Sequence, residues 1–225
     1  MPLPARSFPG SALLVLAFAL LSPSLTSAGD LSVVERWMAT NNGVNTVKIN
    51  FTQTRKMRSL KVPVRQTGTL WMDYRYHRFR WQTGDPAQTI VVRRGSQMFI
   101  LRTPLKKYEV RPYGSGGGAP GMSTLAGGFP RSMEEFQKKY RVTGIKRDSG
   151  VFFIATQPLG SASRGVSSFT FVVGSDDYRL RGMEIALKDG STIETVFHSV
   201  QSNVSMPNSL FAPSLEGYRK TTFGS

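Results

Sequence analysis

The sequence predicts a mainly β protein of the α+β class, in which sequential strands form an antiparallel sheet. Short segments alternate apolar with polar residues, and turns rich in Gly, Pro and Asp separate them at regular intervals. Only two segments have helical period. Strands that follow each other through such short turns favour an antiparallel meander. We therefore expect one sheet accompanied by two short helices.

The first 28 residues are typical of a secretory signal peptide. Arg6 supplies a positive charge, and the apolar run Ala12–Leu21 is too short to span a bilayer as a stable helix. Small residues lead to an expected cut after Ala28, with an uncleaved anchor as the alternative. Residues 29–225 then form a single exported domain, since this length suits one domain of generous size.

A short amphipathic helix is predicted to open the exported chain. Leu31, Val34, Trp37 and Met38 form an apolar stripe over Leu31–Asn41, and Ser32-x-x-Glu35 matches a capping box. A run of short strands should follow it. These strands are expected at Val47–Gln53, Arg65–Asp73, Arg78–Gln82, Thr89–Arg94, Gln97–Arg102 and Lys107–Arg111.

The segment from Gly68 to Trp81 is unusually rich in aromatic and cationic residues. Phe79 and Trp81 are two residues apart and share one strand face, while Arg78 and Arg80 take the other face. One interpretation is a core face with solvated arginines opposite. The other interpretation is a concave apolar surface that binds an apolar ligand.

The strand pattern is interrupted at residues 113–140. A Gly-rich stretch leads to the apolar turn Met122–Ala126 and to Phe129, and a second helix is predicted after the capping box Ser132-x-x-Glu135. A short apolar helix on a Gly-rich segment is typical of a lid, and a plain surface insertion is the alternative.

β-structure then resumes after the second predicted helix. The expected strands are Val142–Ile145, Val151–Thr156, Ser168–Val173, Leu180–Leu187 and Thr192–Val200.

Composition excludes several kinds of chemistry. The chain has no cysteine and two histidines, so it can form neither a disulfide framework nor a thiolate site, and we expect no metal site and no cofactor. No serine lies in a Gly-x-Ser-x-Gly elbow, and the acids lie mostly in turns, so we predict no catalytic residue. A secreted hydrolase is the alternative outside this class. The net charge of +15 is spread along the strands, and export argues against a nucleic-acid partner.

Several motifs, taken in order, resemble the periplasmic outer-membrane lipoprotein carrier family, the LolA-like proteins. The matching residues are Phe51-Thr52-Gln53, Gly68-x-Leu70, Phe79-Arg80-Trp81, Pro86, Val91–Gly95, Met98-Phe99-Ile100, Asn203–Phe211 and Pro213–Gly217. The order of parts, from signal peptide through opening helix, meander, helical interruption and β-return, is also similar. The resemblance covers nearly the whole exported chain.

The resemblance implies a curved, incomplete antiparallel β-barrel with short helices as a lid or plug, the lid lying at about residues 113–140. It implies a monomeric periplasmic carrier, not an enzyme, that takes the acyl chains of lipoproteins in an apolar cavity from the inner to the outer membrane. It also implies an inner-membrane release complex and an outer-membrane acceptor as partners. A carrier or sensor of another lipid or glycolipid is the alternative within the fold.

We predict the cavity lining from the apolar strand faces and the lid. The residues are Phe51, Leu70, Phe79, Trp81, Ile90, Val92, Phe99, Met122, Leu125 and Phe129. A register error of one residue would move a strand's choices to its other face. Members of the family often carry an Arg-Pro pair before the aromatic strand, and the arginine handles ligand. Here that region, Tyr74–Arg78, has no proline and is one residue longer, and Arg75 is the nearest candidate.

Overall fold

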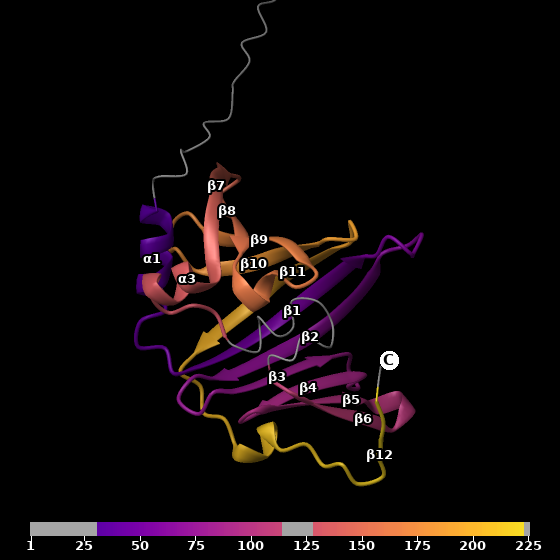
Figure 1. The fold of residues 1–225 in the computed structure, drawn as a ribbon. Helices are drawn as coiled ribbons and strands as arrows, with labels where there is room; N and C mark the ends of the chain where they lie inside the picture. Colours follow the sequence, from indigo (N-terminus) through magenta and orange to yellow (C-terminus); the bar gives the residue numbers. More distant parts are fainter. Residues whose placement is uncertain (1–30, 114–127, 223–225) are drawn as a thin grey trace, which may run out of the picture.

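The computed structural model describes residues 31–113 and 128–222, which form a single curved sheet with helices at one end (Figure 1). The strands are β1 (Thr46–Lys56), β2 (Val64–Asp73), β3 (Arg78–Thr83), β4 (Thr89–Arg94), β5 (Gln97–Arg102), β6 (Lys107–Pro112), β7 (Tyr140–Asp148), β8 (Val151–Pro158), β9 (Val166–Gly174), β10 (Leu180–Leu187), β11 (Thr192–Ser202) and β12 (Arg219–Lys220). The α-helices are α1 (Ser32–Thr40) and α3 (Met133–Lys139), and the 3₁₀ turns are η1 (Thr103–Leu105), η2 (Gly160–Ser163) and η3 (Asn208–Phe211).

Two meanders are joined at the middle of the sheet. The strand order is β12-β6-β5-β4-β3-β2-β1-β11-β10-β9-β8-β7, so β1 near the start of the chain pairs with β11 near its end. All pairs are antiparallel except β12 with β6. The sheet has β12 and β7 at its two edges and does not close. The predicted fold class, a mainly β incomplete barrel, is confirmed.

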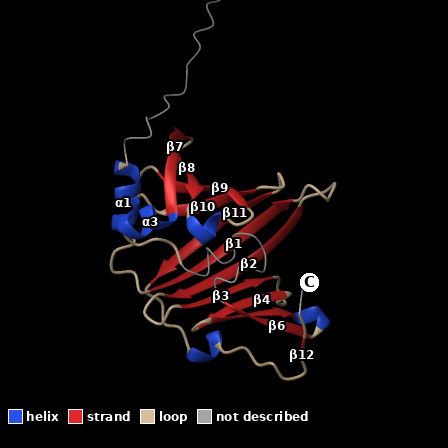
Figure 2. Cartoon of the chain, in the orientation of Figure 1, coloured by secondary structure: helices blue, strands red, loops and turns tan. Residues whose placement is uncertain are grey.

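Both helices cover the inner face of the second half of the sheet, β7–β11 (Figure 2). The Trp37 ring of α1 lies 6.0 Å from the Phe136 ring of α3 and 5.0 Å from that of Phe171 on β9. Such contacts bury the apolar stripes of the helices against the strands, which is the main source of stability for helices this short.

The two predicted capping boxes have different outcomes. At α3 the Ser132 hydroxyl accepts a hydrogen bond from the Glu135 N–H at 3.1 Å, and the Glu135 carboxylate accepts one from the Arg131 N–H at 3.0 Å. At α1 the prediction is wrong, because Ser32 is already the first helical residue and the N-cap Leu31 has no side chain that could accept such a bond.

A β-bulge divides β11 into two parts. Phe51 of β1 pairs with Phe197, while Asn50 pairs with Ser199, so His198 is the extra residue. The bulge reverses the alternation along the rest of the strand. As a result Val200 and Ser202, paired with Ile49 and Val47, lie on the inner face.

In the first half of the sheet, β1–β6, the strands β3–β5 are covered on both faces, whereas the outer face of β1 and β2 stays partly exposed, as at Asn50 and Thr67. The inner face of this half joins the main core, whereas its outer face carries a second cluster, which we call the outer cluster: Ile90, Val92, Leu101 and Phe211, with Trp71, Phe99, Met206, Leu210, Leu215 and Tyr218 packed against it. Residues 203–222 supply the cover, running beneath this half of the sheet before ending at β12 (Figure 1).

Two arginines of β3 hold η3 against this outer face. Arg78 donates to Asn208 Oδ1 at 2.7 Å, its guanidinium lies 4.6 Å from the Phe211 ring, and Arg80 donates to the Leu210 carbonyl at 3.1 Å. Arg78 also forms an ion pair with the buried Asp73 carboxylate, with a nitrogen–oxygen distance of 2.7 Å. The interpretation of Arg78 and Arg80 as solvated is therefore wrong, because the end of the chain covers them.

Candidate functional site

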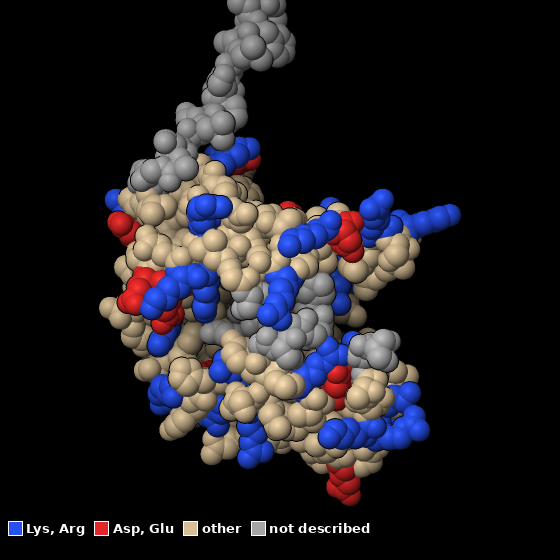
Figure 3. All heavy atoms as spheres, in the orientation of Figure 1, with Lys and Arg blue, Asp and Glu red and all other residues tan. Residues whose placement is uncertain are grey.

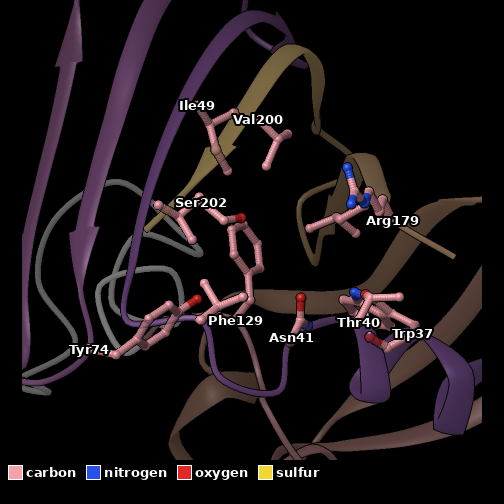
Figure 4. A pocket seen from close by; sticks show the side chains of 12 residues that line it. Trp37, Thr40, Asn41, Ile49, Tyr74, Phe129, Arg179, Val200 and Ser202 are labelled. Carbon is pink, nitrogen blue, oxygen red and sulfur yellow. Dashed lines mark hydrogen bonds between the residues drawn. The ribbon is translucent and has the colours of Figure 1, made fainter. Parts of the chain in front are cut away.

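A pocket of about 400 Å³ opens between α1, the inner face of β1 and β11, and Phe129. This volume lies within the range of ordinary ligand pockets. Figure 4 shows its side chains converging from the helix, the strands and the β9–β10 turn. It is lined by Trp37, Thr40, Asn41, Val44, Val47, Ile49, Tyr74, Phe129, Arg179, Leu180, Val200 and Ser202.

The end of α1 forms one wall. Trp37 is fully buried, and the Thr40 hydroxyl bonds to the Trp37 carbonyl at 2.8 Å, so this polar group is satisfied within its own helix. The Asn41 side-chain amide donates to the Pro130 carbonyl at 3.2 Å. This bond joins the end of α1 to the segment that carries Phe129, so two walls of the pocket are fixed to each other.

The sheet forms the floor. Val47 and Ile49 are on the inner face of β1, and across the strand pair they meet Ser202 and Val200. Val200 has 41% of its surface exposed. Without the bulge in β11, the side chain of Val200 would point to the outer face. The bulge therefore places an exposed apolar side chain in the pocket.

Tyr74 and Phe129 close the side nearest the β2–β3 turn. Gly128 has a φ of +83°, and a Cβ there would lie 2.8 Å from the Tyr74 ring, so a glycine is needed for this approach. Phe129 packs edge-on against Phe197 at 5.9 Å. Burial raises the pKa of the Tyr74 phenol, although the Arg131 guanidinium over its ring opposes this. Tyr74 therefore stays neutral at physiological pH.

Arg179 is at the rim and is the only cation among the lining residues of this described pocket. The turn between β9 and β10 positions it, because Tyr178 has a φ of +53° and its hydroxyl accepts a hydrogen bond from Arg36 at 2.7 Å. An apolar pocket with one exposed cation at its mouth suits an amphiphile with an apolar chain and a polar or acidic end. Each methylene buried there contributes about 0.8 kcal/mol.

Of the predicted lining residues that the structure describes, only Phe129 lines this pocket. Phe51, Leu70, Phe79 and Trp81 are on the same inner face but are almost completely buried in the core, with the Phe51 and Trp81 rings 4.0 Å apart. Met122 and Leu125 lie outside the described residues, as does half of the predicted lid, residues 114–127.

Three predicted lining residues are on the wrong face. Ile90, Val92 and Phe99 belong to the outer cluster under residues 203–222, whereas Val91, Met98 and Ile100 face the inner core. The prediction failed because β4 and β5 are apolar on both faces, so alternation could not say which face was the inner one.

Arg75 lies away from the pocket. It is in the β2–β3 turn with 56% of its side chain exposed, and its Nε is 3.5 Å from Asp73 Oδ1. It borders a separate shallow hollow with Asn45 and Asn203. The arginine that the structure places at the pocket is Arg179, which sequence reasoning missed because nothing in the Asp176–Leu180 turn distinguishes it from other basic turn residues.

Some of the missed lining was visible in the sequence. Trp37 belongs to the predicted helical stripe, and Val47 and Ile49 belong to the alternating face of the first predicted strand. Within residues 31–113 and 128–222, no three carboxylate or imidazole side chains converge as they would to hold a metal ion. In that same part of the chain no helix is both long and apolar enough to cross a bilayer.

The open sheet, its helices at one end and the apolar pocket between them define a binding protein of the incomplete-barrel class. The sequence matches the family of the outer membrane lipoprotein carrier protein LolA over residues 42–214. The chain therefore belongs to the LolA family.

Individual relatives are distant. The outer-membrane lipoprotein carrier protein of Legionella pneumophila (strain Corby) is 24% identical over 170 residues, covering 76% of this chain and 79% of that protein. Among solved structures, an uncharacterized conserved protein from Thermus thermophilus has a TM-score of 0.52 at 8% identity, covering 84% of this chain and 96% of that one. A LolA superfamily protein from Nitrosomonas europaea has a TM-score of 0.45 at 7% identity, covering 80% and 96%. The Thermus structure shows that the fold is shared.

Proposed function

We propose that this protein is a periplasmic carrier that binds the acyl chains of lipoproteins and moves them from the inner to the outer membrane. Family membership makes it a LolA-fold protein of the lipoprotein- and lipid-binding kind. The observation that carries the proposal is the apolar pocket of about 400 Å³, with its exposed Val200 and the rim cation Arg179. It acts by binding and release, without a cofactor and not as an enzyme.

The direction of transport requires two partners and an exported protein. We propose that residues 1–28 are removed after export and that residues 29–225 act as one domain and as a monomer. An inner-membrane complex releases the lipoprotein to the pocket, and an outer-membrane acceptor takes it over. The apolar contact is reversible because it is non-covalent, and its strength grows by about 0.8 kcal/mol with each buried methylene. The same pocket would suit a carrier of another lipid, so the cargo must be identified directly.

Two exposed valines of β11 provide a matched test of the pocket. Val200 is 41% exposed inside it, and Val196 is 43% exposed on the outer face of the same strand. Val200→Asp should weaken binding of a fluorescent fatty-acid probe by at least about ten-fold, because a carboxylate then occupies the acyl site. Val196→Asp should bind the probe like the parent protein. Equal affinities for the two variants, or no binding by the parent, would contradict the proposal.

Native mass spectrometry of protein purified from its own periplasm identifies the cargo. A lipoprotein carrier should retain triacylated or diacylated protein, and Val200→Asp should lose it. Retention of a free lipid or glycolipid alone would replace lipoprotein transport with transport or sensing of that lipid. The same spectrum reports the mass of the exported chain, which tests cleavage after Ala28, and its oligomeric state.

A further inference from the structure

The β1–β2 hairpin ends in a loop, residues 57–63, that projects beyond the rest of the sheet (Figure 1). Large apolar side chains are exposed there: Leu60 at 50%, Val62 at 72% and Val64, at the start of β2, at 38%. Three neighbouring residues of this kind in one short segment are unusual for a surface that contacts only water.

Cations surround these apolar side chains. Lys56, Arg58, Lys61 and Arg65 are all exposed, and the chain has no Asp or Glu between Glu35 and Asp73. Figure 3 shows Lys and Arg gathered on this projecting end. The neighbouring β10–β11 turn supplies Asp189, which interacts with Arg58, and Lys188. The tip therefore keeps a positive excess.

The loop is fixed at its base and free at its tip. The Arg58 N–H donates to the Ser191 hydroxyl at 3.0 Å, and the Leu60 N–H donates to the Met57 carbonyl at 2.9 Å. These bonds turn the chain at the hairpin end, where Leu60, Lys61 and Val62 are all exposed. Exposed apolar side chains and cations side by side on one loop suit the surface of an anionic bilayer, because apolar groups can enter the headgroup boundary while cations contact lipid phosphates.

We propose that residues 56–65 dock this protein on the surface of anionic phospholipid membranes, with Leu60 and Val62 entering the headgroup boundary and Lys56, Lys61 and Arg65 contacting lipid phosphates. This contact is separate from the acyl pocket, because no lining residue of the pocket belongs to the hairpin end. It holds a carrier at a membrane by weak, reversible forces and needs no protein receptor.

Vesicle flotation tests this proposal with the protein recovered from the periplasm after export, its N-terminus determined by mass spectrometry. The parent protein should bind vesicles of phosphatidylcholine with phosphatidylglycerol and bind pure phosphatidylcholine much more weakly. Leu60→Ser with Val62→Ser should lower binding by about ten-fold or more. Lys61→Glu with Arg65→Glu should lower it by at least about twenty-five-fold, since each lost cation contributes about five-fold and each added carboxylate is also repelled by the anionic surface.

Matched variants carry the same changes elsewhere. Leu105→Ser removes a leucine that is 61% exposed, and Lys146→Glu with Lys220→Glu reverses two exposed charges on the edge strands β7 and β12, away from the hairpin. These variants should bind vesicles like the parent, and all variants should bind the fatty-acid probe normally. Absence of binding by the parent, or an equal loss in the matched variants, would overturn the proposal. Loop variants that lose only a protein partner and keep vesicle binding would also overturn it.

Discussion

The two halves of the sheet bury their side chains in different ways. The second half, β7–β11, is covered by α1 and α3 on its inner face, and its outer face is largely open to solvent, as the alternation of buried and exposed residues along β11 shows. In the first half, β1–β6, the strands β3–β5 are covered on both faces, and β4 has three consecutive buried residues, Ile90, Val91 and Val92. The alternation of apolar and polar residues in a sequence therefore identifies the core face only where the other face of the sheet is exposed to solvent.

Because of this difference, we expect substitutions on the inner face of the second half to lower the free energy of unfolding most. Phe171→Ala should lower the free energy of unfolding by about 4 kcal/mol, because the ring packs against Trp37, Phe136 and Tyr140 and its loss leaves a cavity. Thr170→Ala, on the opposite face, should change it by no more than about 0.5 kcal/mol. Urea denaturation measures both, and similar losses would mean that the outer face is also packed.

In the first half, the outer face should contribute nearly as much. Phe211→Ala should cost about 3 kcal/mol in urea denaturation, because the buried ring packs in the outer cluster and under Arg78. It should also expose residues 203–218 to limited proteolysis. Leu105→Ala, at an exposed leucine, should leave both measurements nearly unchanged. A stable Phe211→Ala protein with a protected C-terminal segment would show that the cover does not depend on this ring.

The two halves should also differ in how much an ion pair contributes to the free energy of unfolding. Arg78→Met should cost about 2 kcal/mol, because it leaves the buried Asp73 carboxylate with only the exposed Arg75 beside it. In the second half, the pair Arg181–Asp177 is exposed on both sides, so Arg181→Met should cost no more than about 0.5 kcal/mol. Thermal or urea unfolding of the two variants gives the comparison, and equal costs would contradict it.

Alkaline pH should lower the free energy of unfolding through one buried tyrosine in each half of the molecule, an effect smaller than those of the substitutions above. Burial raises the pKa of Tyr140 in the second half and of Tyr74 at the pocket. Below pH 10 each tyrosine is neutral in both the folded and the unfolded chain, so stability is unaffected. Above pH 10 the unfolded chain loses the proton first, and the free energy of unfolding should fall by about 1.4 kcal/mol per pH unit for each such tyrosine.

Single variants separate these two contributions. Tyr140→Phe should reduce the fall in the free energy of unfolding above pH 10 more than Tyr74→Phe does. The reason is that the pocket opens beside Tyr74, whereas Tyr140 is enclosed by Phe136, Phe169 and Phe171. Unfolding measured from pH 8 to pH 11 tests this order. The same slope in the parent and in both variants would mean that neither phenol is protected.

The sequence by itself determined the local structure of this protein. Period-2 alternation and turn chemistry located the strands, and Thr89–Arg94, Gln97–Arg102 and Leu180–Leu187 have the predicted bounds. Helical period located α1 and α3, and the order of short motifs indicated the family. These signals are local, since each depends on residues a few positions apart.

The tertiary structure decided which faces are inside and where the pocket opens. Ile90, Val92 and Phe99 are outside because residues 203–222 return across the sheet. Val200 is in the pocket because one extra residue, His198, shifts the register against β1. Arg179 meets Trp37 only because the β9–β10 turn packs beside α1. These facts depend on contacts between segments more than 100 residues apart in the chain, and no local pattern contains that information.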